Sequence, residues 1–341
     1  MTTVPVSMTD VRALVDGALR AAVGRLDPHT YRVAAYHLGW TDAEGRPAVP
    51  AGKALRPALV LLSARAAGAA PESGLPGAVA VELTHAFSLL HDDIMDGDRT
   101  RRHRPAAWTV FGEPAAILAG DALLALAAEV LLEAPGPGAT AAAHAMAAAT
   151  RRLIAGQALD LDFESRRQIG LDECLAMSAD KTAALLACSC AIGAVLHGAP
   201  EPLAGALEAF GANVGVAFQL VDDLLGIWGD PVVTGKPALS DLRSRKMSLP
   251  VVAALNAGNA ASARLAELYT LPAGTDAAGP DEGALREIAR LVEAAGGRAW
   301  AEAEAGRRVE RASARLAGAG LPGAVRTEFL HIADFVTRRD H

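Results

Sequence analysis

Apolar residues recur at helical spacing along almost the whole chain. Val11, Leu14, Val15 and Leu19, for example, follow the period of an amphipathic helix. Stretches that alternate between polar and apolar residues, which would indicate strands, are hard to find. Alanine-rich segments such as 141–149 add strong helix propensity. The pattern therefore predicts an all-α fold.

Breaks rich in glycine and proline divide this pattern into about ten to twelve helices. They fall at residues 27–28, 47–52, 70–77, 134–138, 198–202, 229–237 and 271–283. The segment 273–280 is the best candidate for a domain boundary, but helical spacing resumes after it with the same composition. We therefore predict a single domain, residues 1–341, which is large enough to enclose a central cavity.

Composition excludes several classes of protein. The 341 residues include 32 Lys and Arg against 39 Asp and Glu, so no global positive field attracts nucleic acid or an anionic membrane. No apolar run has the length that we expect of a membrane span, and the first residues lack the basic region of a signal peptide. Three cysteines, an odd number, argue against a disulfide framework. We expect a reduced, cytoplasmic protein.

The strongest local feature is an acidic run that closes the apolar stretch 79–90. It reads His91-Asp92-Asp93-Ile94-Met95-Asp96-Gly97-Asp98. Asp92 and Asp96 are four residues apart and lie on one helix face, while Gly97 suits a residue just past the helix end. Carboxylates are disfavoured there because the C-terminal end of the helix dipole is already negative. Bound Mg²⁺ would remove this conflict.

A second run, with Asp222 and Asp223, also follows an apolar helical stretch. Either run alone could be a solvated helix end, but two of them favour a metal site. Basic residues come after both runs, namely Arg99, Arg101, Arg102 and Arg104, and then Lys236, Arg243, Arg245 and Lys246. Acids and bases in this arrangement suit a metal-bridged diphosphate, since arginine provides forked donors and lysine a point charge.

The order and spacing of the motifs resemble the trans-isoprenyl diphosphate synthases of the polyprenyl synthetase family, over a little more than half of the chain. The matching motifs are Gly52-Lys53 with Arg56-Pro57, His85, Asp92-Asp93-Ile94-Met95-Asp96, Arg101-Arg102, Gly156-Gln157 with Asp160, Lys181-Thr182, Phe218-Gln219 with Asp222-Asp223, and Gly235-Lys236 with Asp241 and Lys246. The resemblance implies a helical bundle of the isoprenoid synthase type and a homodimer. It also implies Mg²⁺-dependent coupling of isopentenyl diphosphate to an allylic diphosphate.

The resemblance further implies a role for each matching residue. Two Mg²⁺ ions would be bound by Asp92 and Asp96, and a third by Asp222. The isopentenyl diphosphate would be held by Lys53, Arg56, His85 and Arg102. The allylic diphosphate would be held by Arg101, Lys181, Lys236 and Lys246, of which Lys246, like Asp241, would act through neighbouring residues rather than by direct contact. The expected catalytic residues are Lys181, Thr182, Gln219 and Lys236, of which Thr182 and Gln219 would face the developing allylic cation.

Some positions depart from the family's pattern. Gly226 stands where many members have the third aspartate of the second run, and we expect an uncompensated gap there. Asp230, one turn further on, precedes Pro231 and is typical of a turn. Ala54 replaces a frequent arginine and His103 a frequent glycine, and we expect activity to survive both changes.

Product length is expected to depend on the two positions five and four residues before Asp92. Phe87 with Ser88 resembles geranylgeranyl diphosphate synthases of the archaeal type, in which the aromatic residue forms part of the floor under the growing chain. Ser88 lies nearly on the face of Asp92, so its small side chain leaves the channel open. We expect a twenty-carbon product, with farnesyl diphosphate as the second candidate.

Two other interpretations stay open. A class I terpene cyclase on the same scaffold would ionise a diphosphate without isopentenyl diphosphate, but it has no use for the second diphosphate site formed by Lys53, Arg56, His85 and Arg102. A non-catalytic partner subunit would be expected to lose an aspartate run, and only Gly226 points that way.

Overall fold

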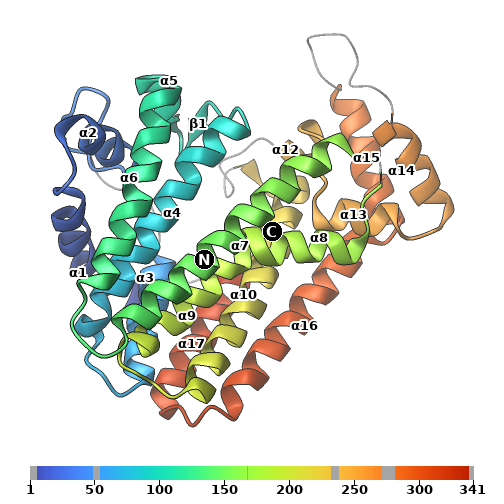
Figure 1. The fold of residues 1–341 in the computed structure, drawn as a ribbon. Helices are drawn as coiled ribbons and strands as arrows, with labels where there is room; N and C mark the ends of the chain where they lie inside the picture. Colours follow the sequence, from blue (N-terminus) through green and yellow to red (C-terminus); the bar gives the residue numbers. More distant parts are fainter. Residues whose placement is uncertain (1–5, 49–53, 167, 232–237, 271–280, 338–341) are drawn as a thin grey trace.

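The computed structural model describes residues 6–48, 54–166, 168–231, 238–270 and 281–337. These residues are almost entirely helical, which confirms the predicted all-α fold (Figure 1). Twelve of the described helices have ten or more residues, in agreement with the number of segments between the breaks in the sequence. Two strands of two residues each form a short antiparallel hairpin.

The first half of the chain builds one side of the molecule up to α6, and α7 then crosses to the other side (Figure 1). Its elements are α1 (Val6–Val23), α2 (Pro28–His37), α3 (Leu55–Ala66), η1 (Pro71–Gly74), α4 (Leu75–Met95), β1 (Thr100–Arg101), β2 (Arg104–Pro105), α5 (Ala107–Phe111), α6 (Glu113–Leu132) and α7 (Ala139–Ser165). Predicted breaks coincide with helix ends here. At the break 27–28, for example, Asp27 caps α2 by accepting hydrogen bonds from the backbone N–H groups of His29 and Thr30.

The second half contributes the centre and the other side. Its elements are α8 (Leu171–Ser178), η2 (Ala179–Ala183), α9 (Ala184–Leu196), α10 (Glu201–Trp228), α12 (Ser240–Arg243), α13 (Leu249–Leu255), α14 (Ala260–Thr270), α15 (Glu282–Ala294), α16 (Gly297–Ala317) and α17 (Gly323–Thr337). Helix α9 is buried along nearly its whole length and packs against α3, α7 and α10. Helix α10 contributes to three apolar clusters, through Phe210, Leu220 and Ile227.

Three helical segments are long and apolar enough to cross a membrane by length and composition alone. They are Glu113–Leu132, Leu171–Leu196 and Glu201–Trp228. The expectation that no apolar run reaches this length was therefore wrong. In the fold, 72% of the apolar window in Leu171–Leu196 and 50% of that in Glu201–Trp228 are buried inside the protein. A helix at the centre of a large bundle is apolar on most sides because neighbouring helices surround it.

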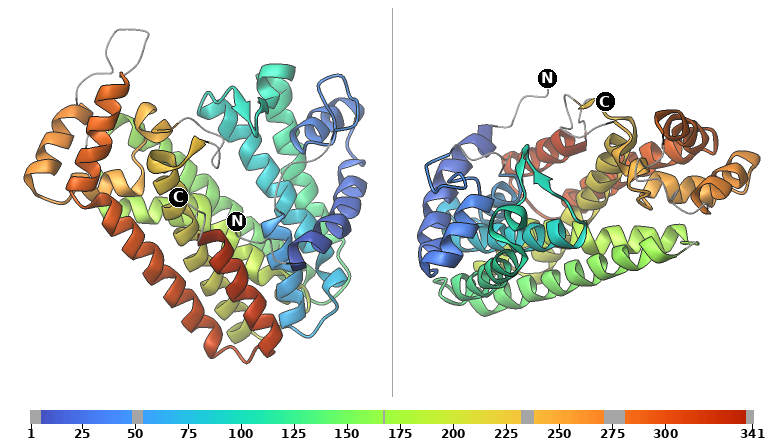
Figure 2. Two further views of the ribbon diagram at one scale, coloured as in Figure 1. Left: turned by 180° about the vertical axis from the view of Figure 1, so that it is seen from behind. Right: turned by 90° about the horizontal axis from the view of Figure 1, so that it is seen from above.

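The long helices α4 and α10 end on the same side of the molecule. Both run toward the upper edge of Figure 1, where the β1–β2 hairpin and α12 lie, and the view from behind in Figure 2 agrees. The two acidic runs lie at or near these ends. The fold therefore brings the two runs to one end of the bundle.

Candidate active site

The first acidic run lies at the C-terminal end of α4, as predicted. The helix ends at Met95, Asp96 caps it, and Gly97 follows with φ 67°, a left-handed conformation that glycine adopts without strain. Burial raises the pKa of the Asp92 carboxyl to about 6, against the opposing charge of Lys181. The run thus carries negative charge in a partly desolvated place, which suits divalent cations.

Asp93, the second residue of this run, faces the protein interior. Its side chain is 1% exposed, and its Oδ1 accepts a 2.5 Å hydrogen bond from Arg101 Nε on β1. The other oxygen, Oδ2, is buried without a hydrogen-bond partner among the described residues. Asp93 therefore fixes Arg101 beside the carboxylates of Asp92 and Asp96.

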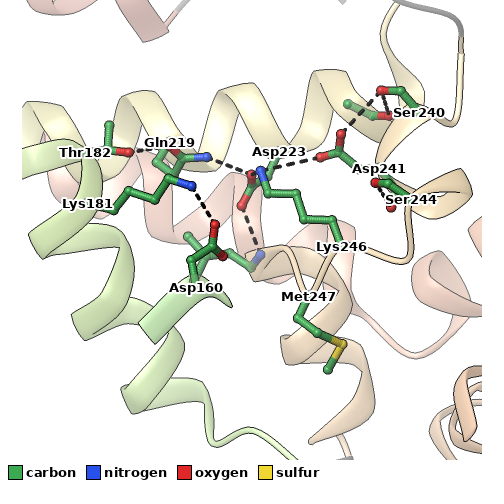
Figure 3. Close-up of polar contacts among 12 residues, drawn as sticks. Asp160, Lys181, Thr182, Gln219, Asp223, Ser240, Asp241, Ser244, Lys246 and Met247 are labelled. Carbon is green, nitrogen blue, oxygen red and sulfur yellow. Dashed lines mark hydrogen bonds and ion pairs between the residues drawn. The ribbon is translucent and has the colours of Figure 1, made fainter. Parts of the chain in front are cut away.

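In the second run, on α10, the two neighbouring aspartates also differ in exposure. Asp222 is exposed, whereas Asp223 is 2% exposed. Asp223 accepts hydrogen bonds from Gln219 Nε2 at 2.8 Å, Lys246 Nζ at 3.2 Å and the backbone N–H of Leu249 at 3.0 Å (Figure 3). The charge of Asp223 is thus neutralised within the protein, whereas the side chain of Asp222 is exposed.

The bond to Asp223 also orients Gln219. Since Nε2 of Gln219 donates to Asp223, its Oε1 faces Thr182, whose hydroxyl donates to it over 2.7 Å (Figure 3). The structure therefore brings together Thr182 and Gln219, which the sequence places 37 residues apart. Thr182 and Gln219 are therefore direct neighbours, and their expected role near a cation stays a prediction.

Lys181 and Thr182 belong to η2, a π-helical turn between α8 and α9. Such turns often occur at functional sites. Two glycines allow neighbouring helices to approach this turn closely. A Cβ on Gly156 of α7 would lie 2.2 Å from the backbone N of Lys181, and one on Gly215 of α10 would lie 2.6 Å from Cα of Ala183. The glycine of the Gly156-Gln157 motif therefore has a packing role, which the spacing alone did not reveal.

Electrostatic interactions join the two runs into one site. Lys181 interacts with Asp92 and Asp96, and its Nζ pairs with Asp160 Oδ2 at 2.5 Å. Asp160 in turn interacts with both Asp96 and Lys246. Among the described residues, no group of three or more potential ligands is already close enough to hold a metal ion. Oxygen atoms of a diphosphate and of water would therefore complete the coordination, as Mg²⁺ sites commonly require.

A separate cavity of about 280 Å³ lies between α1, α3 and α4, and among its charged lining residues three arginines outnumber two acidic residues. Arg56 Nη1 lies 3.2 Å from His85 Nε2, and Arg102 lines the same space. Burial lowers the pKa of His85 well below its ordinary value, so its ring is neutral beside the guanidinium group. Arg56 Nε is buried without a hydrogen-bond partner among the described residues. This buried donor is suited to an anion.

Sequence reasoning missed four charged or polar residues of this cavity: Arg12, Asp16, His37 and Glu82. Glu82 lies one turn before His85 on α4, so helical spacing could have found it. Burial raises the pKa of Glu82 and lowers that of His37 to about 3. His37 ends α2, and no pattern in the sequence links that helix to the cavity.

All non-glycine residues with positive φ in the described part of the chain lie near these two sites. They are Ala54, Arg102, His103, Leu239 and Arg245. Ala54 precedes α3, and Arg102 with His103 forms the turn of the hairpin. The φ of 61° at His103 is one that glycine adopts more easily. Strained backbone of this kind gathers at functional loops.

The two expected chain-length residues are both buried. The Phe87 ring packs edge-on against His91 with centroids 4.8 Å apart, and the Ser88 hydroxyl donates to the His85 carbonyl at 2.9 Å. Two other expected residues, Lys53 and Lys236, lie outside the described residues.

Known proteins resemble this chain over nearly its whole length. The family model for polyprenyl synthetase matches residues 43–280. A (2E,6E)-farnesyl diphosphate synthase of Mycobacterium tuberculosis is 51% identical over 96% of this chain and 90% of its own length. A geranylgeranyl diphosphate synthase of the same organism is 42% identical over 96% of this chain and 92% of its own.

Solved structures agree with these matches. The polyprenyl synthetase of Streptomyces coelicolor superimposes with a TM-score of 0.94 at 54% identity and covers 98% of this chain and 99% of its own. A geranylgeranyl pyrophosphate synthase of Corynebacterium glutamicum, solved in complex with isoprenyl diphosphate and magnesium, superimposes with a TM-score of 0.83 at 27% identity. The match covers 99% of this chain and 100% of that chain.

The all-helical fold, the paired acidic runs and the basic cavity are those of an enzyme that transfers prenyl groups. The chain belongs to the polyprenyl synthetase family. It is a prenyltransferase of the short-chain isoprenyl diphosphate synthase type, and such enzymes use isopentenyl and allylic diphosphates.

Proposed function

We propose that this chain couples isopentenyl diphosphate to an allylic diphosphate and releases a prenyl diphosphate one or more isoprene units longer. The observation that supports this proposal is the presence of two separate groups of charged residues. One is acidic, around Asp92, Asp96 and Asp222, where we propose that metal and the allylic diphosphate bind, and the other is the basic cavity with Arg56 and His85, where we propose that isopentenyl diphosphate binds. A cyclase needs only the first. Retention of both Asp92 and Asp222 also argues against a silent partner subunit.

In this proposal, the carbon–oxygen bond of the allylic diphosphate breaks, and the double bond of isopentenyl diphosphate forms a new bond to the allylic carbon. A proton is then lost from the isopentenyl part to the departing diphosphate. Mg²⁺, which we propose binds as three ions held by Asp92, Asp96 and Asp222, would offset the charge that develops on the leaving group. Lys181 would bind the same diphosphate, since it interacts with both Asp92 and Asp96.

The other residues would position the substrates. Arg56, His85 and Arg102 would hold isopentenyl diphosphate in the basic cavity, together with Lys53. Thr182 and Gln219 would direct their oxygen atoms toward the developing cation. For the allylic diphosphate, the proposal also includes Arg101, Lys236 and Lys246, of which Lys246 is bonded to Asp223 in this structure.

Product analysis tests the function. Purified protein would be incubated with Mg²⁺, isopentenyl diphosphate and each allylic starter in turn, and the products identified by mass spectrometry. We expect longer prenyl diphosphates only when both substrates are present. Arg56→Ala should raise KM for isopentenyl diphosphate far more than KM for the allylic starter. Hydrocarbon formed from an allylic diphosphate alone would instead establish a cyclase.

For the product, we propose geranylgeranyl diphosphate, supported by the pairing of bulky Phe87 with small Ser88 next to the first acidic run. Farnesyl diphosphate is the second candidate, favoured by the 51% identical relative. Phe87→Ala should give longer products and Ser88→Phe shorter ones. A folded Phe87→Ala enzyme with the wild-type product distribution would reduce Phe87 to core packing.

We also propose that the protein is a homodimer. Helices α6 and α7 pack against each other and expose Ile117, Leu118, Leu132 and Ile154, of which Leu118 is 63% exposed. A second copy of this chain would cover these side chains. Leu118→Glu should therefore lower the mass measured by light scattering to that of a monomer. Tyr31→Glu, at a position of α2 that is 37% exposed, is the control and should leave the mass unchanged.

We also propose that residues 1–341 form a single domain. We further propose that the protein is cytoplasmic, does not insert into a membrane and has no nucleic-acid partner. The contributions of α10 to three apolar clusters support the first. Three buried, free cysteines and a net charge of −7 support the second.

A further inference from the structure

The β1–β2 hairpin carries Arg102 on a turn that is unfavourable by itself. Arg101 and Arg104 pair across the two short strands, and Arg102 and His103 form the turn between them with φ 52° and 61°. Both values lie in the left-handed region, where a residue with a Cβ is less stable than glycine. A hairpin this short is also marginal in water. Contacts with other elements must therefore hold the turn, and with it Arg102, in place.

The side chain of Arg104 provides such contacts on the second strand. Its Nη2 donates to the backbone carbonyl of Thr41 at 2.7 Å, and its Cζ lies over the Tyr36 ring, 4.3 Å from the centroid. The Tyr36 hydroxyl in turn donates to the backbone carbonyl of Pro105 at 2.8 Å. Since Tyr36 is buried on α2, these contacts tie β2 to α2 and to the segment that follows it.

Arg101, the cross-strand partner of Arg104, is held independently. Its Nε donates to Asp93 Oδ1 on α4 at 2.5 Å. Like charges directly opposite each other on two strands repel. Here the two guanidinium groups have separate partners, a carboxylate for Arg101, and a carbonyl and an aromatic face for Arg104. Loss of Arg104 should therefore release β2 and the turn while Asp93 still holds Arg101.

The part of the hairpin that Arg104 holds lies at the wall of the basic cavity. His37, next to Tyr36 on α2, lines this cavity together with Arg102, whereas Arg104 lies outside its lining. A smaller space is lined by residues of α2 and of the hairpin together, including Tyr36, His37, Arg102 and Arg104. Glu82 on α4 attracts the Arg102 guanidinium group. Glu82 thus acts on the end of this side chain, and Arg104 on the backbone that carries it.

We propose that Arg104 is a positioning residue for Arg102. It holds the hairpin turn against α2, so that the Arg102 guanidinium group stays in the basic cavity, where isopentenyl diphosphate would bind. This inference rests on the proposed function. Arg104 acts through Arg102 and does not itself bind substrate. Its loss should therefore affect isopentenyl diphosphate more than the allylic diphosphate, because Asp93 still holds Arg101.

The first test compares the two substrates by steady-state kinetics. Arg104→Ala should raise KM for isopentenyl diphosphate roughly 10- to 100-fold, because a small misplacement of a binding group has a large effect. KM for the allylic diphosphate should rise no more than a few-fold. Wild-type values, or an equal rise of both, would overturn the inference.

Arg32→Ala is the matched control. Arg32 also lies over an aromatic ring, that of Phe111, and donates to a carbonyl of the same segment, that of Ala43, but it does so from α2 rather than from the hairpin. It should leave both KM values unchanged. The same selective rise in Arg32→Ala would mean that the segment after α2, and not the hairpin, is responsible, and the proposal would fail.

The second test asks whether Arg104 acts through Arg102. Arg102→Ala should itself raise KM for isopentenyl diphosphate. Adding Arg104→Ala to it should change that KM no more than a few-fold, since the effects of residues that act as one unit do not add. If Arg104 bound the diphosphate directly, the two rises would multiply, which would refute a positioning role.

Circular dichroism and thermal melting would verify that Arg104→Ala is folded. If it is not, Tyr36→Phe takes its place, because it removes only the hydroxyl that bonds to Pro105 and keeps the aromatic ring. A rise of a few-fold in KM for isopentenyl diphosphate alone would then support the inference, and wild-type values would overturn it.

Arg102→Ala also separates this inference from the proposed function. Unchanged KM for isopentenyl diphosphate in Arg102→Ala would refute the proposed role of Arg102 in that site. A raised KM in Arg102→Ala with a wild-type KM in Arg104→Ala would refute only the role of Arg104. A wild-type enzyme without coupling activity would refute the proposed function itself.

Discussion

The two acidic runs share one design but are completed in different ways. In each run the first aspartate, Asp92 or Asp222, is more exposed than the second, Asp93 or Asp223, which is buried in an ion pair. The first run carries its last carboxylate, Asp96, within the same helix end. The second run has Gly226 at the equivalent place, and Asp241 arrives there from α12.

This difference shows that a carboxylate can be provided locally or by tertiary structure. Helical spacing gives a local carboxylate its position, because residues four apart share a face. A carboxylate from another element needs contacts that hold that element in place and a glycine that leaves room for it. A carboxylate placed by helical spacing can be recognised from a sequence motif, whereas one that comes from another element can be recognised only in the fold.

The largest effect is expected from the first aspartates. Asp92→Asn and Asp222→Asn should each lower kcat roughly 10²- to 10⁴-fold, because metal-bound charge stabilisation is worth several kcal/mol. Folding should change little, since each substitution removes repulsion and opens no cavity. Steady-state kinetics and thermal melting would measure both. A loss in only one variant would show that the runs do not contribute equally.

The second aspartates should affect stability as well as rate. Asp93→Asn leaves Arg101, which is 27% exposed, without its partner, and should lower the free energy of unfolding by about 2 kcal/mol. Asp223→Asn should do the same through Lys246 and also release Gln219 from its orientation. Urea denaturation would test this. Wild-type stability in both variants would mean that the buried pairs contribute nothing.

Gly226→Ala should have a smaller effect, which is confined to the second acidic run. The added Cβ would collide with Asp241, so we expect a lower melting temperature and about tenfold weaker Mg²⁺-dependent pyrophosphate binding. Gly205→Ala on the same helix is the matched control. A Cβ there meets only the end of the Glu201 side chain, so helix propensity should raise stability slightly. Equal behaviour of the two variants would contradict the crowding at Gly226.

The smallest effect is expected from Asp230→Ala. The residue is exposed and lies beyond the end of α10, so kcat should stay within a few-fold of wild type. A loss as severe as that of Asp222→Asn in the same assay would show that Asp230 compensates for the glycine at position 226.

Helical periodicity and the two acidic runs were readable from the sequence because they depend on neighbours within one helix. Apolar spacing gave the all-α fold, and Gly97 marked the end of α4 through a conformation that glycine favours. The spacing of Asp92 and Asp96 placed both on one face for the same reason. These are local properties, so they need no knowledge of the rest of the chain.

Tertiary structure decided which polar groups meet. Asp93 and Asp223 look like their neighbours in the sequence, yet the fold buries both and pairs them with Arg101 and Lys246. His37 reaches the basic cavity because α2 packs against α6 and α1. Asp241 reaches Gly226 because a left-handed turn directs α12 onto α10. Contacts between distant segments depend on how helices pack, and packing is a property of the whole chain that no single motif contains.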